Sequence, residues 1–401
     1  MQGFLFHNSK KDVSELFQEY YADLHIHIGR TWKGKPVKIT GSKSLTLENI
    51  LQTATSKKGL DIVGVIDCHS PEVLEEMMAL IEEEKLVELP GGGLRYQKTT
   101  LIPGVEIEVN DSNCLGPLHV LAFFRSWQAM REFSTWMKNY VTNINLSTQR
   151  IACDAVTLQH KVHALSGLFI PAHVFTPFKS AYGKGVKNSL AEVFDMDQID
   201  AIELGLSSDT DMVKGISELE KYTFVTNSDA HSLGKMAREY QKIRMKEPTF
   251  DELQKALREV DGRKIIANYG LNPLLGKYHE TACADCGYRT TEIPCSNCGG
   301  KHLVKGVKLR IEELSDTKET LRKRPPYIHQ IPLDYIPGIG QKTMQKLLIN
   351  FGTEMAVLHE IPESELEKVV PAKLALLIDQ GRNGKLSLSV GGGGAYGKVK
   401  A

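Results

Sequence analysis

Histidine and acidic side chains follow several predicted strands at a spacing that suits metal binding. His25 and His27 stand two residues apart after the apolar run 20–24, and residues i and i+2 of a strand project to the same side. Similar patterns end other strands, at Asp67-Cys68-His69, Asp229-Ala230-His231, Glu106, His119 and His173. Without metal ions, so many neighbouring ionisable groups would be desolvated and mutually repelling. The pattern therefore predicts a multinuclear metal site.

Strand-like and helix-like stretches alternate over residues 1–275, which predicts an α/β barrel with a mainly parallel sheet. Apolar runs predict strands at 20–28, 61–66, 100–109, 118–124, 167–172, 199–204, 222–226 and 264–267, and helical spacing predicts helices at 47–58 and 71–85. Thr249 with Glu252 three residues later predicts a further helix start. The carboxyl ends of barrel strands converge on one face, so we expect the metal-binding candidates to meet there.

The ordered motifs DLHIH, IDCH, GVE, two single histidines and SDAH resemble the polymerase-and-histidinol-phosphatase (PHP) superfamily over about residues 20–270. The resemblance implies a distorted (βα)7 barrel with up to three metal ions. The first ion would be held by His25, His27, Glu106 and Asp229. Glu106 would bridge to a second ion, completed by His119 and His173, and His69 and His231 would contribute to a third.

This sequence departs from the superfamily at 29–33, where many members carry a further histidine or aspartate. The difference bears on the occupancy of the third position. Asp23 and Asp67 would orient the histidines, although Asp67 could also be a direct ligand. The predicted catalytic residues are thus Asp229, Glu106, Asp67 and Asp23.

Imidazole and carboxylate ligands together suit zinc, manganese or iron, with magnesium as a possible addition in an assay. Two metals that share a carboxylate lie about 3.5–4 Å apart, and such a pair can clamp a phosphodiester and activate water. We therefore expect phosphoester hydrolysis. Glu203 and Ser207, near another strand end, could line the substrate pocket or merely terminate the strand.

Two C-x-x-C pairs lie close together after the predicted barrel. Cys283 and Cys286 are followed, eight residues later, by Cys295 and Cys298. Four thiolates form a closed tetrahedral zinc site, which is structural rather than catalytic. We therefore predict a four-cysteine zinc ribbon over 276–314. A segment of this size buries little core, so the metal would supply much of its stability.

The remainder of the chain predicts a linker, a small helical domain and a tail. Residues 315–331 are charged and contain two adjacent prolines, which indicates a basic linker, and 391–401 are glycine-rich, which favours a flexible tail. Between them, 332–390 resemble a helix-hairpin-helix domain. Backbone N–H groups at such a glycine turn can bind a DNA phosphate. The predicted DNA contacts are Gly338, Ile339, Gly340, Lys342, Lys346, Arg322, Lys323 and Arg324.

The formal net charge of zero is a cancellation between two parts of the chain. The chain has 49 Lys and Arg and 49 Asp and Glu. Residues 276–401 hold 18 basic and 14 acidic residues, so the barrel region carries the compensating negative charge. Within 301–346 there are ten basic and five acidic residues. A concentrated positive patch favours salt-dependent phosphate contacts.

Composition and the lack of targeting signals in the sequence argue against a disordered, a membrane-spanning and a secreted protein. Hydrophobic residues at 41% and charged residues at 24% indicate a globular protein. No apolar run approaches the roughly 20 residues that span a bilayer, and the first eleven residues do not resemble a secretory signal. We therefore expect a cytoplasmic protein with reduced thiols and no membrane association.

The order of barrel, zinc ribbon and helix-hairpin-helix region resembles the endonuclease Q family across nearly the whole chain. The resemblance implies a monomeric DNA repair endonuclease, with a sliding clamp as a possible partner. It would cut 5′ to deoxyuridine, deoxyinosine, deoxyxanthosine or an abasic site, leaving a 3′-hydroxyl and a 5′-phosphate. One alternative is a small-molecule phosphatase such as histidinol-phosphate phosphatase. The other is a non-catalytic DNA-binding scaffold.

Overall fold

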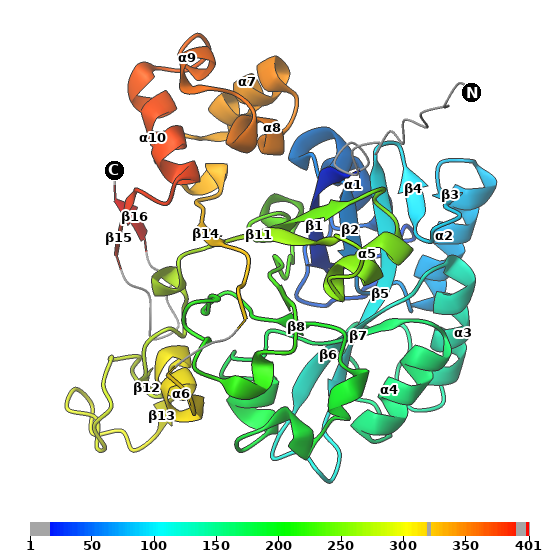
Figure 1. Cartoon of the computed structure of the whole chain (residues 1–401), viewed down its shortest axis with the longest axis vertical. Coiled ribbons are helices and arrows are strands. Elements are labelled where there is room, and N and C mark those ends of the chain that lie inside the picture. Colours follow the sequence, from blue (N-terminus) through cyan, green and yellow to red (C-terminus); the bar gives the residue numbers. More distant parts are fainter. Residues whose placement is uncertain (1–16, 319–321, 390–397, 401) are drawn as a thin grey trace, which may run out of the picture.

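The structure, a computed structural model, describes residues 17–318, 322–389 and 398–400. A ten-stranded sheet forms its centre (Figure 1). The main path of the sheet runs β14-β11-β10-β1-β2-β5-β4-β3, and β6 and β7 continue from β5. Its strands are β1 (Gln18–Ile26), β2 (Ile62–Val65), β3 (Val87–Glu88), β4 (Leu94–Tyr96), β5 (Thr99–Val109), β6 (Leu118–Phe123), β7 (Leu168–Pro171), β10 (Tyr240–Met245), β11 (Lys264–Gly270) and β14 (Tyr327–His329).

The sheet is mixed, which corrects the prediction of a mainly parallel sheet. β1, β2 and β5 are parallel, but β5 pairs antiparallel with β6, and β6 with β7. For β5 and β6 the physical reason is the short connection at 110–117, since a parallel crossover needs about a dozen residues or more. β8 (Ile202–Glu203) and β9 (Phe224–Val225) form a separate parallel pair.

Hydrogen-bonded strand pairing does not close the predicted barrel within the described residues. Isolated backbone hydrogen bonds instead connect the separate β8–β9 pair to the main sheet, on one side after β7 and on the other side after β1. The N–H of Val174, after β7, donates to the carbonyl of Glu203 on β8 at 2.9 Å, and His27 donates to Ala230 at 3.1 Å. The α/β class is thus confirmed, and the closed barrel stays a prediction.

Apolar side chains fill both sides of the sheet and hold the motif strands rigidly. All of β2, β5 and β6 is buried. On β1 the pairing register with β2 shifts between Asp23 and Ile26, within the first metal motif. Such irregularities re-aim side chains and are common beside active sites. The strand core therefore supplies a firm base from which the polar motif emerges.

Helices cover the sheet (Figure 1). Pro71 opens α2 at its first turn, and Thr249 caps α5 by accepting the N–H of Glu252, as predicted. Short 3-10 and π turns fill the long segments around β8 and β9. The helices of this region are α1 (Leu47–Thr53), α2 (Pro71–Glu82), α3 (Trp127–Met137), α4 (Ala155–Ala164) and α5 (Phe250–Leu257). Among the described residues, no helix is both long and apolar enough to span a bilayer.

The C-terminal part begins with a small cysteine-bearing hairpin and ends in a group of helices. β12 (Ala282–Cys283) pairs antiparallel with β13 (Leu303–Val304), and α6 (Val307–Leu314) follows. The later elements are α7 (Gln341–Phe351), α8 (Glu354–His359), α9 (Glu363–Leu366), α10 (Ala372–Arg382), β15 (Ser387–Ser389) and β16 (Lys398–Lys400). Apart from β16, the predicted tail lies outside the described residues.

The predicted linker is part of the sheet. Its strand β14 pairs in parallel with β11. Just before β14, Arg324 donates to the carbonyls of Tyr222 and Leu219 at 2.8 and 2.7 Å, and its guanidinium lies 3.4 Å from the ring centroid of Phe224. Burial lowers the pKa of Arg324 to about 10. This stretch is therefore held against the α/β region.

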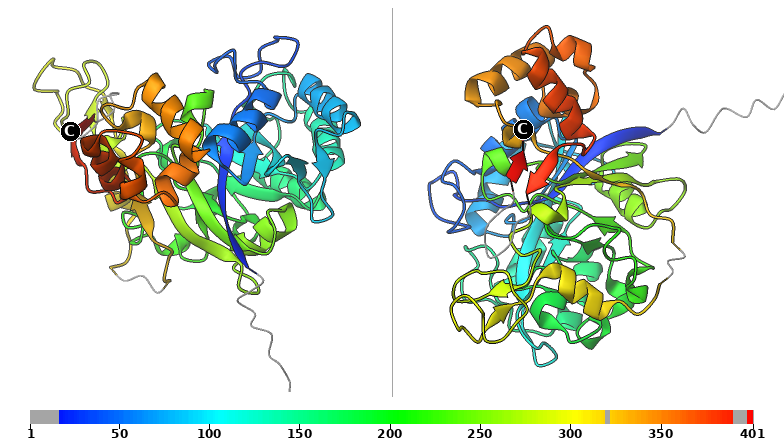
Figure 2. Two further views of the ribbon diagram at one scale, coloured as in Figure 1. Left: turned by 90° about the horizontal axis from the view of Figure 1, so that it is seen from above. Right: turned by 90° about the vertical axis from the view of Figure 1, so that its left-hand side faces the viewer.

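The helices α7–α10 pack against the same α/β region, beside α1 (Figure 2). Lys58 Nζ forms an ion pair with Glu354 Oε2 at 2.9 Å, and only 7% and 13% of their side chains are exposed. Nearby, His359 stacks on Tyr21, with ring centroids 4.7 Å apart, and its Nε2 lies 2.6 Å from the hydroxyl oxygen of Tyr240. A buried ion pair and an aromatic cluster thus fix the helical region in place.

We expect Lys58→Met to destabilise the protein by about 2–4 kcal/mol, slightly less than the loss of one partner from a fully buried pair. The substitution leaves Glu354 without its cation in a buried position. Urea denaturation should show a lower unfolding midpoint than for Lys57→Met, an exposed neighbour. Equal midpoints for the two variants would contradict the structural role of the pair.

Candidate metal centre

The C-terminal end of β1 and the segment after β9 bring two histidines and an aspartate together. His25 Nε2 and His27 Nε2 each lie 3.5 Å from Asp229 Oδ1. The three residues offer one ligand atom each within a span of 4.8 Å, which is the spacing of donors around one metal ion. Asp229 adopts a φ of +46°, a conformation that non-glycine residues rarely use and that clusters at functional sites.

Glu106, on β5, connects this group to a second one. Its Oε1 lies 3.6 Å from His25 Nε2, and its Oε2 lies 3.6 Å from His27 Nε2. Its Oε1 also lies 2.9 Å from His119 Nδ1 and 3.3 Å from His173 Nε2. Glu106, His119 and His173 form a second set of three ligand atoms within 4.8 Å. One carboxylate therefore faces two adjacent ligand groups, which is the position that the superfamily resemblance implies for Glu106.

Buried nitrogens without hydrogen-bond partners show that the group around His25 and His27 fits a metal ion. His25 Nε2 and His27 Nε2 are buried and have no hydrogen-bond partner, and the same holds for His119 Nε2 and His173 Nδ1. Buried polar atoms are normally paired, so each such atom calls for an explanation. A divalent ion between the imidazoles and carboxylates would satisfy the nitrogens of His25 and His27 together.

A second layer of carboxylates orients the two histidines of β1. His25 Nδ1 donates to Glu203 Oε1 at 2.9 Å, and His27 Nδ1 lies 3.0 Å from Asp67 Oδ2. Glu203 also accepts the backbone N–H of His173 at 2.8 Å. Carboxylates in this position fix the ring tautomer and leave the opposite nitrogen for the metal. The sequence suggested that Glu203 either lines the substrate pocket or ends a strand, and it did not indicate this contact with His25.

Asp23 is buried and accepts hydrogen bonds from backbone N–H groups rather than from an imidazole. Its carboxylate accepts the N–H of Ala237 at 2.9 Å, that of Ser228 at 3.1 Å and that of His25 at 3.4 Å. Burial raises its pKa. Asp23 therefore ties the segment that carries Asp229 to β1.

The residues proposed for a third ion do not assemble in the same way. His69 Nε2 faces the carbonyl of Leu146 at 3.2 Å, while its buried Nδ1 has no partner. His231 Nε2 lies 3.4 Å from Asp229 Oδ1, with 40% of its side chain exposed. Within the described part of the chain, neither histidine belongs to a group of three ligand atoms.

The carboxylates at the centre are held in their charged form. Burial alone would raise the pKa values of Glu106 and Asp229, but the neighbouring histidines outweigh it and keep both well below the ordinary value. Burial would lower the pKa of Lys38, yet Glu106 and Asp67 outweigh that effect and raise it. The centre therefore combines ionised ligands with one buried ammonium group.

A cavity of about 440 Å³ opens onto these ligands. Lys179 and Lys235 are among the residues that line it. Lys235 Nζ also pairs with Asp334 Oδ2 at 3.1 Å. The rings of Phe178 and Tyr278 form part of the wall, at a centroid distance of 5.3 Å and an angle of 81°. The cavity thus joins metal ligands, cations and an aromatic surface.

Comparisons with known proteins place this architecture. The protein YqxK of Bacillus subtilis, described as uncharacterized, is 55% identical over 385 residues, covering 96% of this chain and 100% of YqxK. The lesion-specific endonuclease PfuEndoQ from Pyrococcus furiosus has a TM-score of 0.82 at 33% identity, covering 96% of this chain and 95% of that one. The chain belongs to the endonuclease Q family. No family model matches the sequence.

A second solved endonuclease Q structure shows the protein in complex with a 27-mer duplex substrate that has an abasic lesion at the active site. It has a TM-score of 0.81 and 32% identity, and the match covers 96% of each chain. Both structures match from the α/β region into the C-terminal part, so the family assignment rests on the whole architecture rather than on the metal motifs alone.

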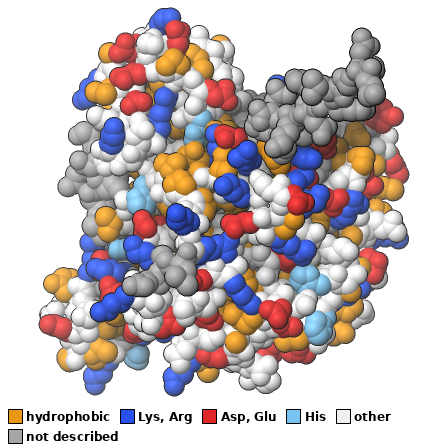
Figure 3. All heavy atoms as spheres, viewed as in Figure 1, with side chains coloured by type: hydrophobic (Ala, Val, Ile, Leu, Met, Phe, Trp, Pro, Cys, Tyr) orange, Lys and Arg blue, Asp and Glu red, His pale blue; other side chains and the backbone are white. Residues whose placement is uncertain are grey.

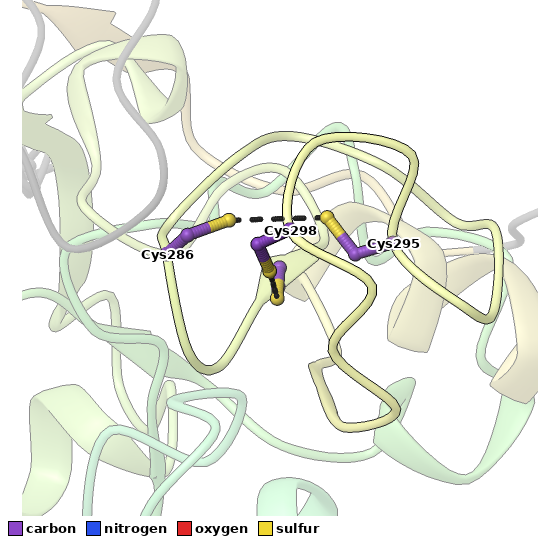
Figure 4. A group of neighbouring side chains, drawn as sticks. Cys286, Cys295 and Cys298 are labelled. Carbon is purple, nitrogen blue, oxygen red and sulfur yellow. Dashed lines mark hydrogen bonds between the residues drawn. The ribbon is translucent and has the colours of Figure 1, made fainter.

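In this endonuclease Q family member the four predicted cysteines converge (Figure 4). Cys283 Sγ lies 3.6 Å from Cys298 Sγ, and Cys286 Sγ lies 3.8 Å from Cys295 Sγ. Zn–S bonds of 2.3 Å place tetrahedral sulfurs about 3.8 Å apart, whereas a disulfide brings them to about 2 Å. The spacing therefore suits a tetrahedral metal site and excludes disulfides.

The glycine turn that resembles a helix-hairpin-helix motif precedes α7. Gly338 has a φ of +95°, and a Cβ added to Gly340 would meet no atom within 4 Å, so the backbone there is open to approach. Lys342 and Lys346 are exposed on α7. Between β14 and the glycine turn, a stretch described throughout, the chain forms the short 3-10 turn η9 (Leu333–Tyr335) and no full helix. The contact of the glycine turn and of the two lysines with DNA stays a prediction.

The basic stretch before β14 has protein partners. Arg322 donates to the carbonyl of Glu220 at 2.9 Å and pairs with Glu259 at 2.9 Å, and Arg324 is anchored as described above, whereas Lys323 is exposed. Lys and Arg side chains gather over the middle of the face shown in Figure 3, with acidic side chains among them. The two arginines thus have a structural use that their charge alone did not reveal.

Sequence reasoning also missed contacts made by the segment 146–150. Ser147 Oγ lies 3.2 Å from His27 Nδ1, and the hydroxyl of Thr148 donates to Glu106 Oε2. Lys38 Nζ lies 3.3 Å from the same oxygen. The local sequence around these residues does not predict their contacts, because their partners lie 42 to 120 positions away in the chain.

We expect Glu203→Gln to weaken metal binding at the histidine centre by about 10–100-fold, the usual effect of losing an outer carboxylate. The amide cannot stabilise the His25 ring as a ligand in the same way. Competition with a chromophoric chelator measures the affinity. Glu132→Gln, an exposed acid paired with Lys161, serves as the control. Unchanged affinity in Glu203→Gln would reject the orienting role.

Replacing Cys298 by Ser should remove one tightly bound metal per chain, because one of four thiolates is lost. Elemental analysis of the purified protein measures the loss, and thermal unfolding should begin at a lower temperature. The matched control is Cys114→Ser, which alters a partly buried cysteine outside the cluster. Equal metal content in both variants would show that the cluster binds none.

Proposed function

We propose that the protein is a metal-dependent DNA repair endonuclease. It would hydrolyse the phosphodiester 5′ to deoxyuridine, deoxyinosine, deoxyxanthosine or an abasic site, leaving a 3′-hydroxyl and a 5′-phosphate. The observation that carries the proposal is the pair of ligand groups joined by Glu106 in a chain that matches PfuEndoQ over 95% of its length. The abasic duplex bound to the second endonuclease Q structure supports the substrate class.

The ligand atoms of His25, His27 and Asp229 would hold one divalent ion, and those of Glu106, His119 and His173 the other. When bound, such ions neutralise phosphoryl oxygens and make water more acidic. Zinc, manganese and iron all suit this donor set. Glu203 and Asp67 keep the imidazoles aligned.

The cavity supports action on a single extruded nucleotide. Its volume of about 440 Å³ lies in the range of pockets for small ligands. Phe178 and Tyr278 offer aromatic surface on its wall. Enzymes that act on one nucleotide of a duplex flip it out of the stack, which costs least for damaged or weakly paired bases. A deaminated base or an abasic site meets that condition.

The glycine turn would supply the grip on the flanking duplex. Lys235 lines the cavity and pairs with Asp334, and its ammonium lies 4.3 Å from the ring centroid of Tyr335, on the short turn that leads into the glycine turn at 338–340. Backbone N–H groups before α7 would bind phosphate without reading bases. The DNA is thus expected to contact the cavity and the glycine turn together. The protein would act in the cytoplasm as a monomer, with a sliding clamp as a candidate partner.

Cleavage of labelled duplexes tests the proposal. With a divalent metal, the protein should cut a strand with one deoxyuridine, deoxyinosine or abasic site and leave the undamaged duplex intact. We expect Asp229→Asn to lower the rate by more than about 100-fold, since loss of a direct ligand exceeds the effect of an outer partner. Asp211→Asn, at an exposed acid, is the control.

Two outcomes would contradict the proposal. Hydrolysis of small phosphate monoesters without cutting of DNA would favour a phosphatase. Duplex binding without any hydrolysis under each of the candidate metals would favour a non-catalytic scaffold.

A further inference from the structure

The loop after β1 carries a lysine into the metal centre. The side chain of Lys38 is only 16% exposed, lines the cavity and ends 3.3 Å from Glu106 Oε2, the carboxylate that the two ligand groups share. Other lysines of this loop lie outside. Lys35, three residues earlier, is 72% exposed and pairs with Glu72 on α2. A largely buried ammonium beside the carboxylate that both ligand groups share therefore needs a specific explanation.

Thr148 holds that ammonium in one position. Lys38 Nζ donates to Thr148 Oγ1 at 2.8 Å, and the Thr148 hydroxyl donates in turn to Glu106 Oε2. Thr148 has a φ of +53°. A β-branched residue adopts that conformation only under constraint, and such strain clusters at functional sites.

The segment around Thr148 is braced against the metal centre on both sides. Ser147 Oγ lies 3.2 Å from His27 Nδ1, and the carbonyl of Leu146 faces His69 Nε2 at 3.2 Å. On the other side, Arg150 Nε donates to Glu108 Oε1 at 2.7 Å. The position of Thr148, and through it that of Lys38, is therefore set by the same residues that shape the ligand groups.

The Lys38 ammonium keeps capacity for a ligand. An ammonium group has three N–H donors. Thr148 and Glu106 accept two of them, and the third has no protein acceptor among the described residues. The group faces the cavity that also contains Glu106 and Asp229. An anion bound between the two ligand groups would thus lie beside a preorganised positive charge, which is the arrangement that stabilises charge during phosphoryl transfer.

We infer that Lys38 is a catalytic residue whose ammonium group, held by Thr148, contacts a non-bridging oxygen of the phosphate to be cleaved. The inference rests on the proposed function for its substrate, but the binding of phosphate tests it separately. Lys38 adds charge without forming or breaking a bond. Thr148 is a positioning residue, because it acts through Lys38.

Four variants of the full chain separate this role from a structural one. Lys38→Met removes the charge and keeps most of the volume, and Lys38→Arg keeps the charge. Thr148→Val removes the hydroxyl, and Thr148→Ser restores it. Lys35→Met is the control on the same loop. Melting temperatures first establish that each variant folds.

The readouts are metal content, affinity for inorganic phosphate by calorimetry, and cleavage of a duplex with one abasic site. We expect Lys38→Met to retain its metals, bind phosphate about tenfold more weakly and lose about 100-fold or more in kcat with little change in KM, as for the loss of one fixed donor to a developing charge. Lys38→Arg and Thr148→Ser should recover part of the loss, and Lys35→Met should match the parent.

Two results would overturn the inference. If Lys38→Met binds phosphate as the parent does, the ammonium does not contact it. If the variant loses metal in proportion to activity, Lys38 acts through Glu106 instead. A parent protein that cleaves no damaged duplex refutes the proposed function alone, because the comparison of phosphate affinities still decides the role of Lys38.

Discussion

The buried carboxylate of Glu106 is the constraint on which the site depends. A strand core places it next to four imidazoles and one ammonium group, where burial would otherwise make its charge costly. Opposite charges and metal-binding nitrogens compensate for that cost from several elements at once. The strand β5, which carries Glu106, is buried along its whole length. The carboxylate therefore sets the position around which the ligands, their outer partners and the cavity are arranged.

The spacing of single motifs predicted that the candidate ligands would meet, and the superfamily resemblance supplied their division into groups. Histidines two apart on a strand share a side, and strand ends meet on one face. The structure brings His25, His27 and Asp229 together, and likewise Glu106, His119 and His173. The four cysteines were equally readable from their spacing. In each case the chemistry requires only a short motif and a strand or turn to present it.

Contacts between distant segments were beyond such reasoning. The antiparallel pairing of β5 with β6 depends on a short connection, and the place of β14 in the sheet depends on an open strand edge. Charge counting assigned Arg322 and Arg324 to DNA, yet carbonyl groups of the α/β region hold both. Thr148 carried no motif at all, because its importance comes from a strained backbone and from partners far away in sequence.

The pairing of β14 with β11 makes the C-terminal part more than an appendage. β14 covers the backbone donors and acceptors at the end of β11, over Asn268–Gly270. A chain shortened to the α/β region would leave those groups uncovered, and uncovered strand edges recruit other chains. The two halves therefore form one folding unit at this boundary. Evolutionary exchange of helices α7–α10 for another module would have to preserve residues 327–329, or supply another strand in their place.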